Sequence, residues 1–205
     1  MSLFSRLSVK EKQQQVREDA LLDAAHSLLA SKGYEHMTVD DVASEAGVAK
    51  ASVYKHFVSK EALAAAVMIR LLDRALEYIR ALPPEQQALD KLQSVLRWAL
   101  ELRLHGGLPL LPSSSEAVRQ GLLSNRQYVT RILALNEAML RLVDEAKAGG
   151  HISAALPSEV MLFSLYARTC DPSVDYIKMT GHYTDSEIVN YLVTIGVTGL
   201  ITPPK

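Results

Sequence analysis

The sequence predicts an all-α protein: an N-terminal three-helix head with a helix-turn-helix, then a larger C-terminal helical domain, about nine helices in all. Three observations predict this fold. Apolar residues recur at helical spacing along most of the chain. Helix-start and helix-stop signals separate these stretches. No stretch shows the alternating pattern of a β-strand. We expect the head to span residues 1–60 and the C-terminal domain residues 61–205.

The first helix is expected from about Lys10 to Ser31, after a loose N-terminal arm. Its apolar residues recur every three or four positions, and Gly33 follows its end. The stripe consists of Val16, Leu21, Ala24, Ala25 and Leu28.

Two short helices joined by a glycine are expected next. Thr38 can cap the backbone N–H groups of the following turn, and Asp41 stands three residues later, as in a capping box. Gly47 ends this helix, because glycine adopts the left-handed C-cap conformation freely. A second helix follows from about Lys50 to Phe57. Two short helices around a glycine turn are the pattern of a helix-turn-helix.

Six further helices are expected in the C-terminal domain. Ser59 is a candidate N-cap for the first, and Leu82-Pro83-Pro84 ends it because proline cannot continue a helix. Thr184-Asp185-Ser186-Glu187 is a second capping-box pattern, and residues 170–183 are expected to be irregular or briefly helical. The expected helices cover about residues 59–81, 85–104, 116–123, 126–148, 157–169 and 184–201.

Composition restricts the class of protein. The net charge of −1 excludes a uniformly basic nucleic-acid binder but allows a local positive patch. The single cysteine, Cys170, excludes an internal disulfide framework and suits a reducing cytoplasm. No apolar run is long enough to span a membrane, and no secretory signal pattern stands at the start. We therefore expect a cytoplasmic protein that does not enter a membrane.

The second short helix has an acid-free polar face, since no Asp or Glu occurs between Val48 and Lys60. A helix that reads DNA needs phosphate contacts for register and base-edge contacts for sequence. A lysine ammonium group reaches guanine O6 and N7, so Lys50 and Lys55 are candidate base readers. The alternative is an ordinary solvated face with Tyr54 in the core. The candidates for phosphate contacts are Thr38, Ser52, Tyr54, His56 and Lys60.

The motif Thr38-Val39-x-x-Val42-Ala43-x-x-Ala46-Gly47-Val48 is followed by Val53-Tyr54-x-His56-Phe57-x-x-Lys60-Glu61-x-Leu63. Over roughly residues 15–65 the chain therefore resembles the DNA-binding signature of TetR-family transcriptional regulators. Other helix-turn-helix families lack the Tyr-x-x-Phe-x-x-Lys continuation into a long helix. The resemblance implies backbone contacts by Thr38, Tyr54, His56 and Lys60. It implies that Lys50, Ala51 and Lys55 face the bases, where Ala51 would meet a thymine methyl.

The resemblance also implies a sequence-specific regulator, a repressor that a small molecule releases from its operator by favouring another conformation. One recognition helix buries too little surface for tight specific binding, whereas a dimer reads two half-sites about 34–36 Å apart. We therefore expect double-stranded DNA with a palindromic operator, a small-molecule effector and a homodimer as partners.

The helices at about 157–169 and 185–201 are the candidates for dimerisation. Their apolar stripes are wider than one core requires, and the resemblance implies a four-helix interface between two copies there. The alternative is that both helices bury their stripes within one chain.

The C-terminal domain offers a candidate lining for an apolar or aromatic ligand. Each of its residues can equally be ordinary core. A metal sensor built on His105, Cys170 and Asp171 matches no metal-ligand spacing, so we expect no metal and no cofactor. The candidate lining consists of Trp98, Leu102, His105, Met139, Phe163 and Tyr166.

Two other functions compete with this interpretation. An enzyme is not expected, because the chain has no Gly-x-Ser-x-Gly motif, no phosphate-cradling glycine loop, no Cys–His cluster and no evident pair of catalytic carboxylates. A helical interaction module, or a ligand-binding protein that does not regulate through operator DNA, is the alternative to the regulator.

Overall fold

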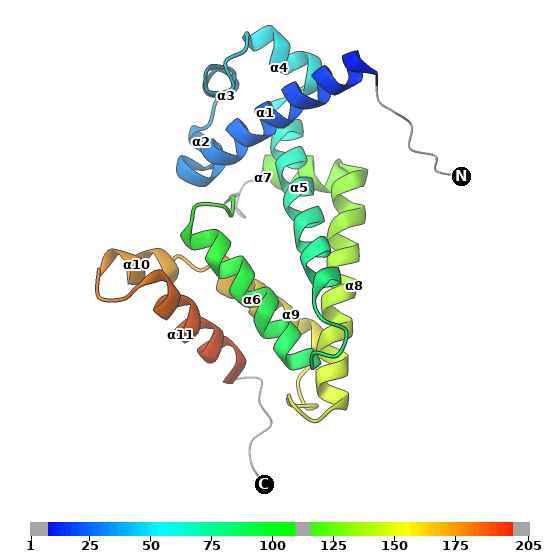
Figure 1. The fold of residues 1–205 in the computed structure, drawn as a ribbon, viewed down its shortest axis with the longest axis vertical. Helices are drawn as coiled ribbons and strands as arrows, with labels where there is room; N and C mark the ends of the chain where they lie inside the picture. Colours follow the sequence, from blue (N-terminus) through cyan, green and yellow to red (C-terminus); the bar gives the residue numbers. More distant parts are fainter. Residues whose placement is uncertain (1–7, 110–115, 199–205) are drawn as a thin grey trace. The chain divides into compact units, whose positions relative to one another are not determined.

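The computed structural model describes residues 8–109 and 116–198, and its regular elements there are eleven helices (Figure 1). The all-α prediction is confirmed. Two short helices, α2 and α10, lie where we expected a turn and an irregular or briefly helical segment. The helices are α1 Val9–Ser31, α2 Gly33–His36, α3 Val39–Glu45, α4 Lys50–His56, α5 Lys60–Ala81, α6 Ala88–Leu104, α7 Glu116–Ser124, α8 Arg126–Ala148, α9 Ser158–Cys170, α10 Ser173–Met179 and α11 Asp185–Thr198.

The chain divides into two compact units, one of Met1–Met68 with Pro109–Asn125 and one of Ile69–Leu108 with Arg126–Lys205. The division falls inside α5, C-terminal to the boundary that we expected at residue 60. The reason is that the first turns of α5 pack into the core of the first unit. They contribute Leu63, Ala64 and Val67 to that core.

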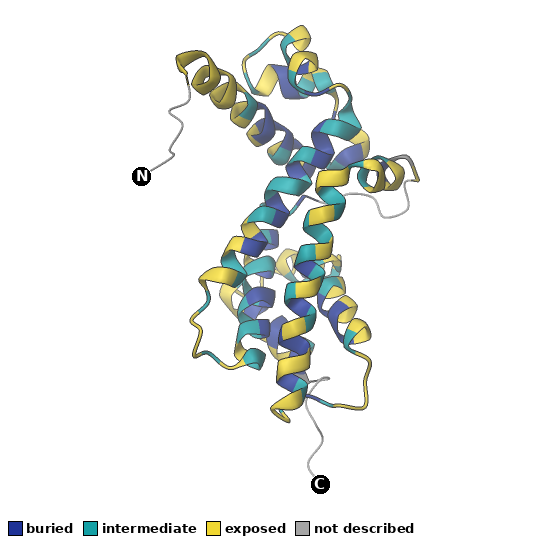
Figure 2. Cartoon of the chain, turned by 90° about the vertical axis from the view of Figure 1, so that its right-hand side faces the viewer, coloured by how far each residue is buried: buried dark blue, intermediate teal, exposed yellow. Residues whose placement is uncertain are grey.

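The core of the first unit is built from one face of each of its helices. Leu21 and Ala25 of α1 and Val42 of α3 are fully buried. Because Val53 and Phe57 of α4 join the same cluster, the opposite face of α4 is turned away from it. The predicted stripe of α1 is shorter than we expected, since Val16 is 68% exposed. Residues 8–17 of α1 and its cap are all exposed (Figure 2).

Local hydrogen bonds confirm the helix-start and helix-stop predictions. The Asp41 N–H donates to Thr38 Oγ1 (3.1 Å), and the Thr38 N–H donates to Asp41 Oδ2 (3.0 Å). The Ala62 N–H donates to Ser59 Oγ at the start of α5 (3.1 Å). Gly47 has φ +66° and takes the left-handed conformation that ends α3. The turn that orients α4 therefore follows from neighbouring residues.

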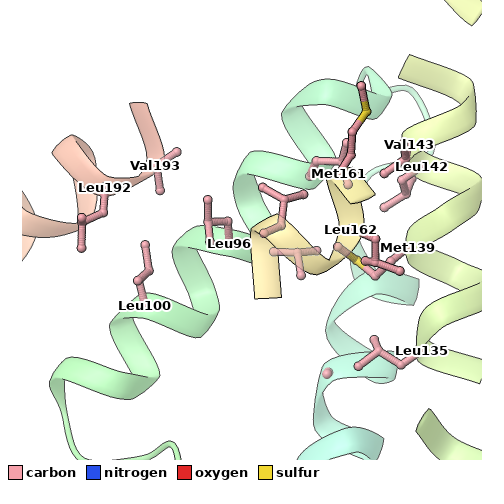
Figure 3. Packing of buried hydrophobic residues seen from close by; sticks show 14 of the residues in the cluster. Leu96, Leu100, Leu135, Met139, Leu142, Val143, Met161, Leu162, Leu192 and Val193 are labelled. Atoms are coloured by element: carbon pink, nitrogen blue, oxygen red, sulfur yellow. The ribbon is translucent and has the colours of Figure 1, made fainter. Parts of the chain in front are cut away.

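The core of the second unit lies between α6, α8, α9 and α11. Figure 3 shows Leu96 and Leu100 of α6 facing Leu192 and Val193 of α11. A Cβ added to Gly196 would stand 3.1 Å from Leu96 Cδ2, so α11 approaches α6 closely at this glycine. Close helix approach was our reason for expecting a glycine here. The second predicted glycine, Gly199, lies outside the described residues.

The start of α11 carries the predicted capping box. The Thr184 N–H donates to Glu187 Oε2 (2.8 Å), and the Glu187 N–H donates to Thr184 Oγ1 (3.2 Å). These bonds hold the carboxylate form and lower the pKa of Glu187. None of the helices in the described ranges is long and apolar enough to cross a membrane.

We predict that Gly47→Ala lowers the free energy of unfolding by about 1 kcal/mol, because an L side chain is strained at positive φ. Space is not the cause, since a Cβ at Gly47 would meet no atom within 4 Å. Urea unfolding followed by circular dichroism measures the loss. Gly47→Asn is the matched control and should lose less, because asparagine tolerates this conformation. Equal stability of all three proteins would contradict the prediction.

Candidate functional site

The outward face of α4 is acid-free and carries most of the predicted DNA contacts. Val53 and Phe57 are 1% and 8% exposed, and the residues between them turn outward. Tyr54 is 47% exposed, so the alternative that it belongs to the core is wrong. Lys50, Ala51 and Lys55 are exposed as well, and Ser52 is half-buried. The helix thus presents two ammonium groups, a phenol and a methyl group on one surface.

The two lysines of this face differ in their surroundings. Lys50 Nζ lies 2.8 Å from Asp40 Oδ2 of α3. The hydrogen bond and the charge of Asp40 raise the pKa of Lys50. Among the described residues, Lys55 has no carboxylate at ion-pair distance. Lys55 is therefore available to DNA at once, whereas Lys50 must share its proton donors with Asp40 or exchange partner.

Thr38 and His56 already have partners within the first unit. The Thr38 hydroxyl donates to Asp41 Oδ2 (2.8 Å), and this bond is the largest cause that lowers the pKa of Asp41. The His56 side chain is only 9% exposed, and its Nδ1 lies 3.8 Å from Glu18 Oε2 of α1. A phosphate contact by either group would have to compete with these partners.

Lys60 is held beside the head by an aromatic ring. Its Nζ stands 4.2 Å from the centroid of Tyr34 in α2, at cation–π distance, and 3.5 Å from the Glu35 carbonyl. The Tyr34 hydroxyl donates to Glu61 Oε1 (2.8 Å). Burial, followed by the bond to Glu61, raises the pKa of Tyr34. We did not predict this role of Tyr34, and no spacing in the sequence signals it.

The second unit encloses a cavity of about 120 Å³ between α5, α6, α8 and α9. Its size compares with apolar cavities of about 150 Å³ that hold a benzene molecule. No charged side chain lines it, so an occupant meets mainly hydrocarbon. The lining residues are Leu71, Leu72, Ala75, Leu92, Val95, Leu96, Trp98, Ala99, Leu108, Leu135, Met139, Leu165, Tyr166 and Thr169.

Three of the six predicted ligand residues, Trp98, Met139 and Tyr166, line this cavity. The other three lie elsewhere: Leu102 packs beside Gly107. His105 is exposed, and its Nδ1 lies 2.7 Å from the Glu101 carbonyl. Phe163 is 59% exposed. The helical period alone does not tell which apolar face borders a void.

The polar groups of the cavity wall are engaged with their neighbours. The Tyr166 hydroxyl donates to Asn136 Oδ1 (3.1 Å), and burial raises the pKa of Tyr166. The Thr169 hydroxyl donates to the Tyr166 carbonyl (2.8 Å). Trp98 stacks on Tyr78 with ring centroids 5.2 Å apart. The wall is therefore apolar in its free binding capacity as well as in its composition.

No cluster of three or more potential metal ligands occurs in the parts of the chain that the structure describes. Cys170 is exposed at the end of α9. Asp171 Oδ1 accepts the Ser173 N–H (2.8 Å), which serves the start of α10.

Comparison with protein families identifies the first unit. Residues 21–67 match the family described as bacterial regulatory proteins, tetR family. The HTH-type transcriptional repressor KstR2 of Mycolicibacterium smegmatis is 26% identical over 186 residues, which cover 90% of each chain. The HTH-type transcriptional regulator AlkX of Mycobacterium tuberculosis is 32% identical over 76 residues, 37% of this chain and 36% of AlkX.

Solved structures share the fold over most of the chain. The fatty acid degradation regulator FadR of Bacillus halodurans has a TM-score of 0.70 at 20% identity and covers 90% of this chain and 96% of its own. FadR of Bacillus subtilis in complex with stearoyl-CoA has a TM-score of 0.67 at 20% identity, with 89% and 98% covered. At these identities the likeness establishes the helical fold.

We predict that the double change Lys50→Ala with Lys55→Ala lowers affinity for a selected duplex more than affinity for random DNA. Each lost base contact should cost about 1–3 kcal/mol at its cognate site. Fluorescence anisotropy with selected and random duplexes across a salt series measures both affinities.

Lys91→Ala is the matched control, because Lys91 lies in the second unit, where its Nζ donates to the Pro84 carbonyl. This change should leave both affinities unaltered. An equal loss on both duplexes in the double variant would mean that Lys50 and Lys55 contact phosphates only.

Proposed function

Because the chain is a transcriptional regulator of the TetR family, we propose that it binds a palindromic operator as a homodimer and leaves that operator when an apolar small molecule occupies its internal cavity. The observation that carries the first part is the exposed, acid-free face of α4. The proposal makes the protein a repressor that acts in the cytoplasm without turning over its ligand. KstR2, the relative that covers 90% of the chain, is also named a repressor.

The assignment of contacts on DNA follows from exposure and charge. Lys50, Ala51 and Lys55 are the base-facing residues, since they are exposed on the outward face of α4. Tyr54 and Ser52 reach phosphates from the same helix. Thr38, His56 and Lys60 contact phosphates once their present partners release them, and Lys60 stays within reach because the ring of Tyr34 stabilises its charge without a carboxylate.

Dimerisation follows from apolar side chains that the second unit leaves exposed. On α9, Val160 and Phe163 are 54% and 59% exposed. On α11, Tyr191 and Ile195 are 51% and 55% exposed, one helical turn apart. Since α9 and α11 also contact one another, their exposed faces can form one surface. A monomer rarely exposes a contiguous apolar patch of this kind, so this surface favours the interface that we predicted from the sequence.

The effector site follows from the cavity and from α5. Leu71, Leu72 and Ala75 line the cavity, while Leu63 and Val67 of the same helix belong to the core of the first unit. A ligand that favours a different packing of α5 therefore changes the free energy of operator binding by its differential affinity for the two states. The stearoyl-CoA complex of Bacillus subtilis FadR is consistent with an effector that has a large apolar part.

The test of operator binding is selection of the purified protein against random duplexes. We expect enrichment of a palindrome whose half-site centres lie about 34–36 Å apart, with an affinity that falls as salt rises. Addition of the apolar ligand should release the operator. Failure to enrich any sequence, together with affinity that ignores salt, would support the interaction module instead.

We predict that Phe163→Glu weakens self-association at least about tenfold, because a charge would replace an aromatic anchor inside the interface. Analytical ultracentrifugation measures the dimer dissociation constant. Operator affinity should fall in parallel, since one head reads only one half-site.

Leu133→Glu is the matched control for this change. Leu133 lies on α8 and is 60% exposed, so it receives the same substitution away from the proposed interface. A Phe163→Glu protein that remains as dimeric as the Leu133→Glu protein would remove α9 from the interface.

A further inference from the structure

Arg103 has a buried donor without a partner. Its side chain is 4% exposed at the C-terminal end of α6. Nη1 donates to the Thr169 carbonyl (3.1 Å), and Nη2 donates to Asp175 Oδ2 (2.6 Å). Nε is buried and has no hydrogen-bond partner within the described parts of the chain. Because a buried N–H without an acceptor is unfavourable, this atom is suited to receive one from a ligand.

Arg103 stands at the wall of the cavity. Thr169 lines the cavity and accepts the hydrogen bond from Nη1. On α6, the cavity residues Leu92, Leu96 and Ala99 follow one another at steps of four and three. Arg103 is the next position of the same stripe, four residues after Ala99. The guanidinium thus continues the apolar lining of α6 at the Thr169 end.

The hydroxyl groups of the wall cannot take over this task without breaking existing bonds. The Tyr166 hydroxyl already donates to Asn136, and the Thr169 hydroxyl donates to the Tyr166 carbonyl. A ligand oxygen that enters at this end would therefore gain a hydrogen bond from Arg103 Nε at no loss to the protein.

Charge balance decides what kind of acceptor fits. The carboxylate of Asp175 lies on Nη2 and compensates the positive charge of Arg103. A second carboxylate, brought by the ligand, would leave a net negative charge beside an apolar cavity, which is costly. A neutral carbonyl oxygen accepts the same hydrogen bond without this cost.

We propose that the cavity binds an apolar molecule carrying one neutral hydrogen-bond acceptor, a ketone, ester or thioester carbonyl, and that Arg103 Nε donates to that oxygen. This inference rests on the proposed function only in taking the cavity as the effector site. It adds the chemical class of the effector and a residue that selects it.

Direct binding to the protein without DNA provides the test. Trp98 is the only tryptophan of the chain and lines the cavity, so its fluorescence reports an occupant. The probes are methyl hexyl ketone, its carboxylate counterpart octanoate, and toluene, which has no acceptor. We expect the ketone to bind at least about tenfold more tightly than octanoate, with calorimetry as the second readout.

Two variants and one control separate selection from structural support. Arg103→Lys removes Nε and should weaken the ketone about tenfold while leaving toluene unaffected. Asp175→Asn removes the compensating charge and should shift the ratio of the two affinities toward octanoate about tenfold. Arg97→Lys is the matched control on α6, because Arg97 pairs with Asn190 instead of facing this cluster, and it should change neither ratio.

The shift toward octanoate in Asp175→Asn is the readout that a purely structural role of Arg103 would not produce. The Asp175 side chain is 56% exposed, so this variant keeps the test open even where Arg103→Lys fails to fold. An unchanged ketone-to-octanoate ratio in Asp175→Asn overturns the proposal, and so does the absence of any binding by toluene and the ketone. Failure of operator selection leaves these binding ratios untouched, which distinguishes the two proposals.

Discussion

The packing of one helix into two hydrophobic cores is the constraint on which the rest of this structure depends. Leu63, Ala64 and Val67 of α5 are buried with the helix-turn-helix, and Leu72, Ala75 and Leu76 of the same helix are buried in the second unit. An α-helix transmits displacement along its axis because each residue is hydrogen-bonded to the next turn. A ligand beside Ala75 and a DNA-binding helix above Leu63 therefore act on the same rigid element, which gives the proposed coupling a physical carrier.

The DNA-facing surface is held in place before any DNA arrives. Lys50 is paired with Asp40, Lys60 lies over the ring of Tyr34, and Thr38 is bonded to Asp41. Each of these partners is exchangeable, since exposed pairs contribute only about 0–1 kcal/mol. The duplex backbone offers a much denser negative charge, so phosphates can displace Asp40 and Asp41. The head thus keeps its donors near their working positions at little cost to binding.

The second unit combines a dry cavity with one charged group at its edge. The lining contains no charged side chain, and its two hydroxyls donate to neighbours. Arg103 is tolerated there because Asp175 compensates its charge and Thr169 accepts one of its protons. In such surroundings hydrogen bonds and charges both count more than in water. Specificity for a ligand can therefore come from a single oxygen atom on an otherwise apolar molecule.

By itself the sequence determined the all-α class, the helix-turn-helix and the capping boxes at Thr38 and Thr184, because these depend on residues within one or two turns of each other. Tertiary structure alone decided that Lys50 meets Asp40, that Arg103 meets Thr169 sixty-six residues away, and that Leu102, His105 and Phe163 lie outside the cavity while Leu71 and Thr169 line it. A helical stripe states which face is apolar but not which neighbour it meets, since side-chain volumes from several helices together determine where packing leaves a void.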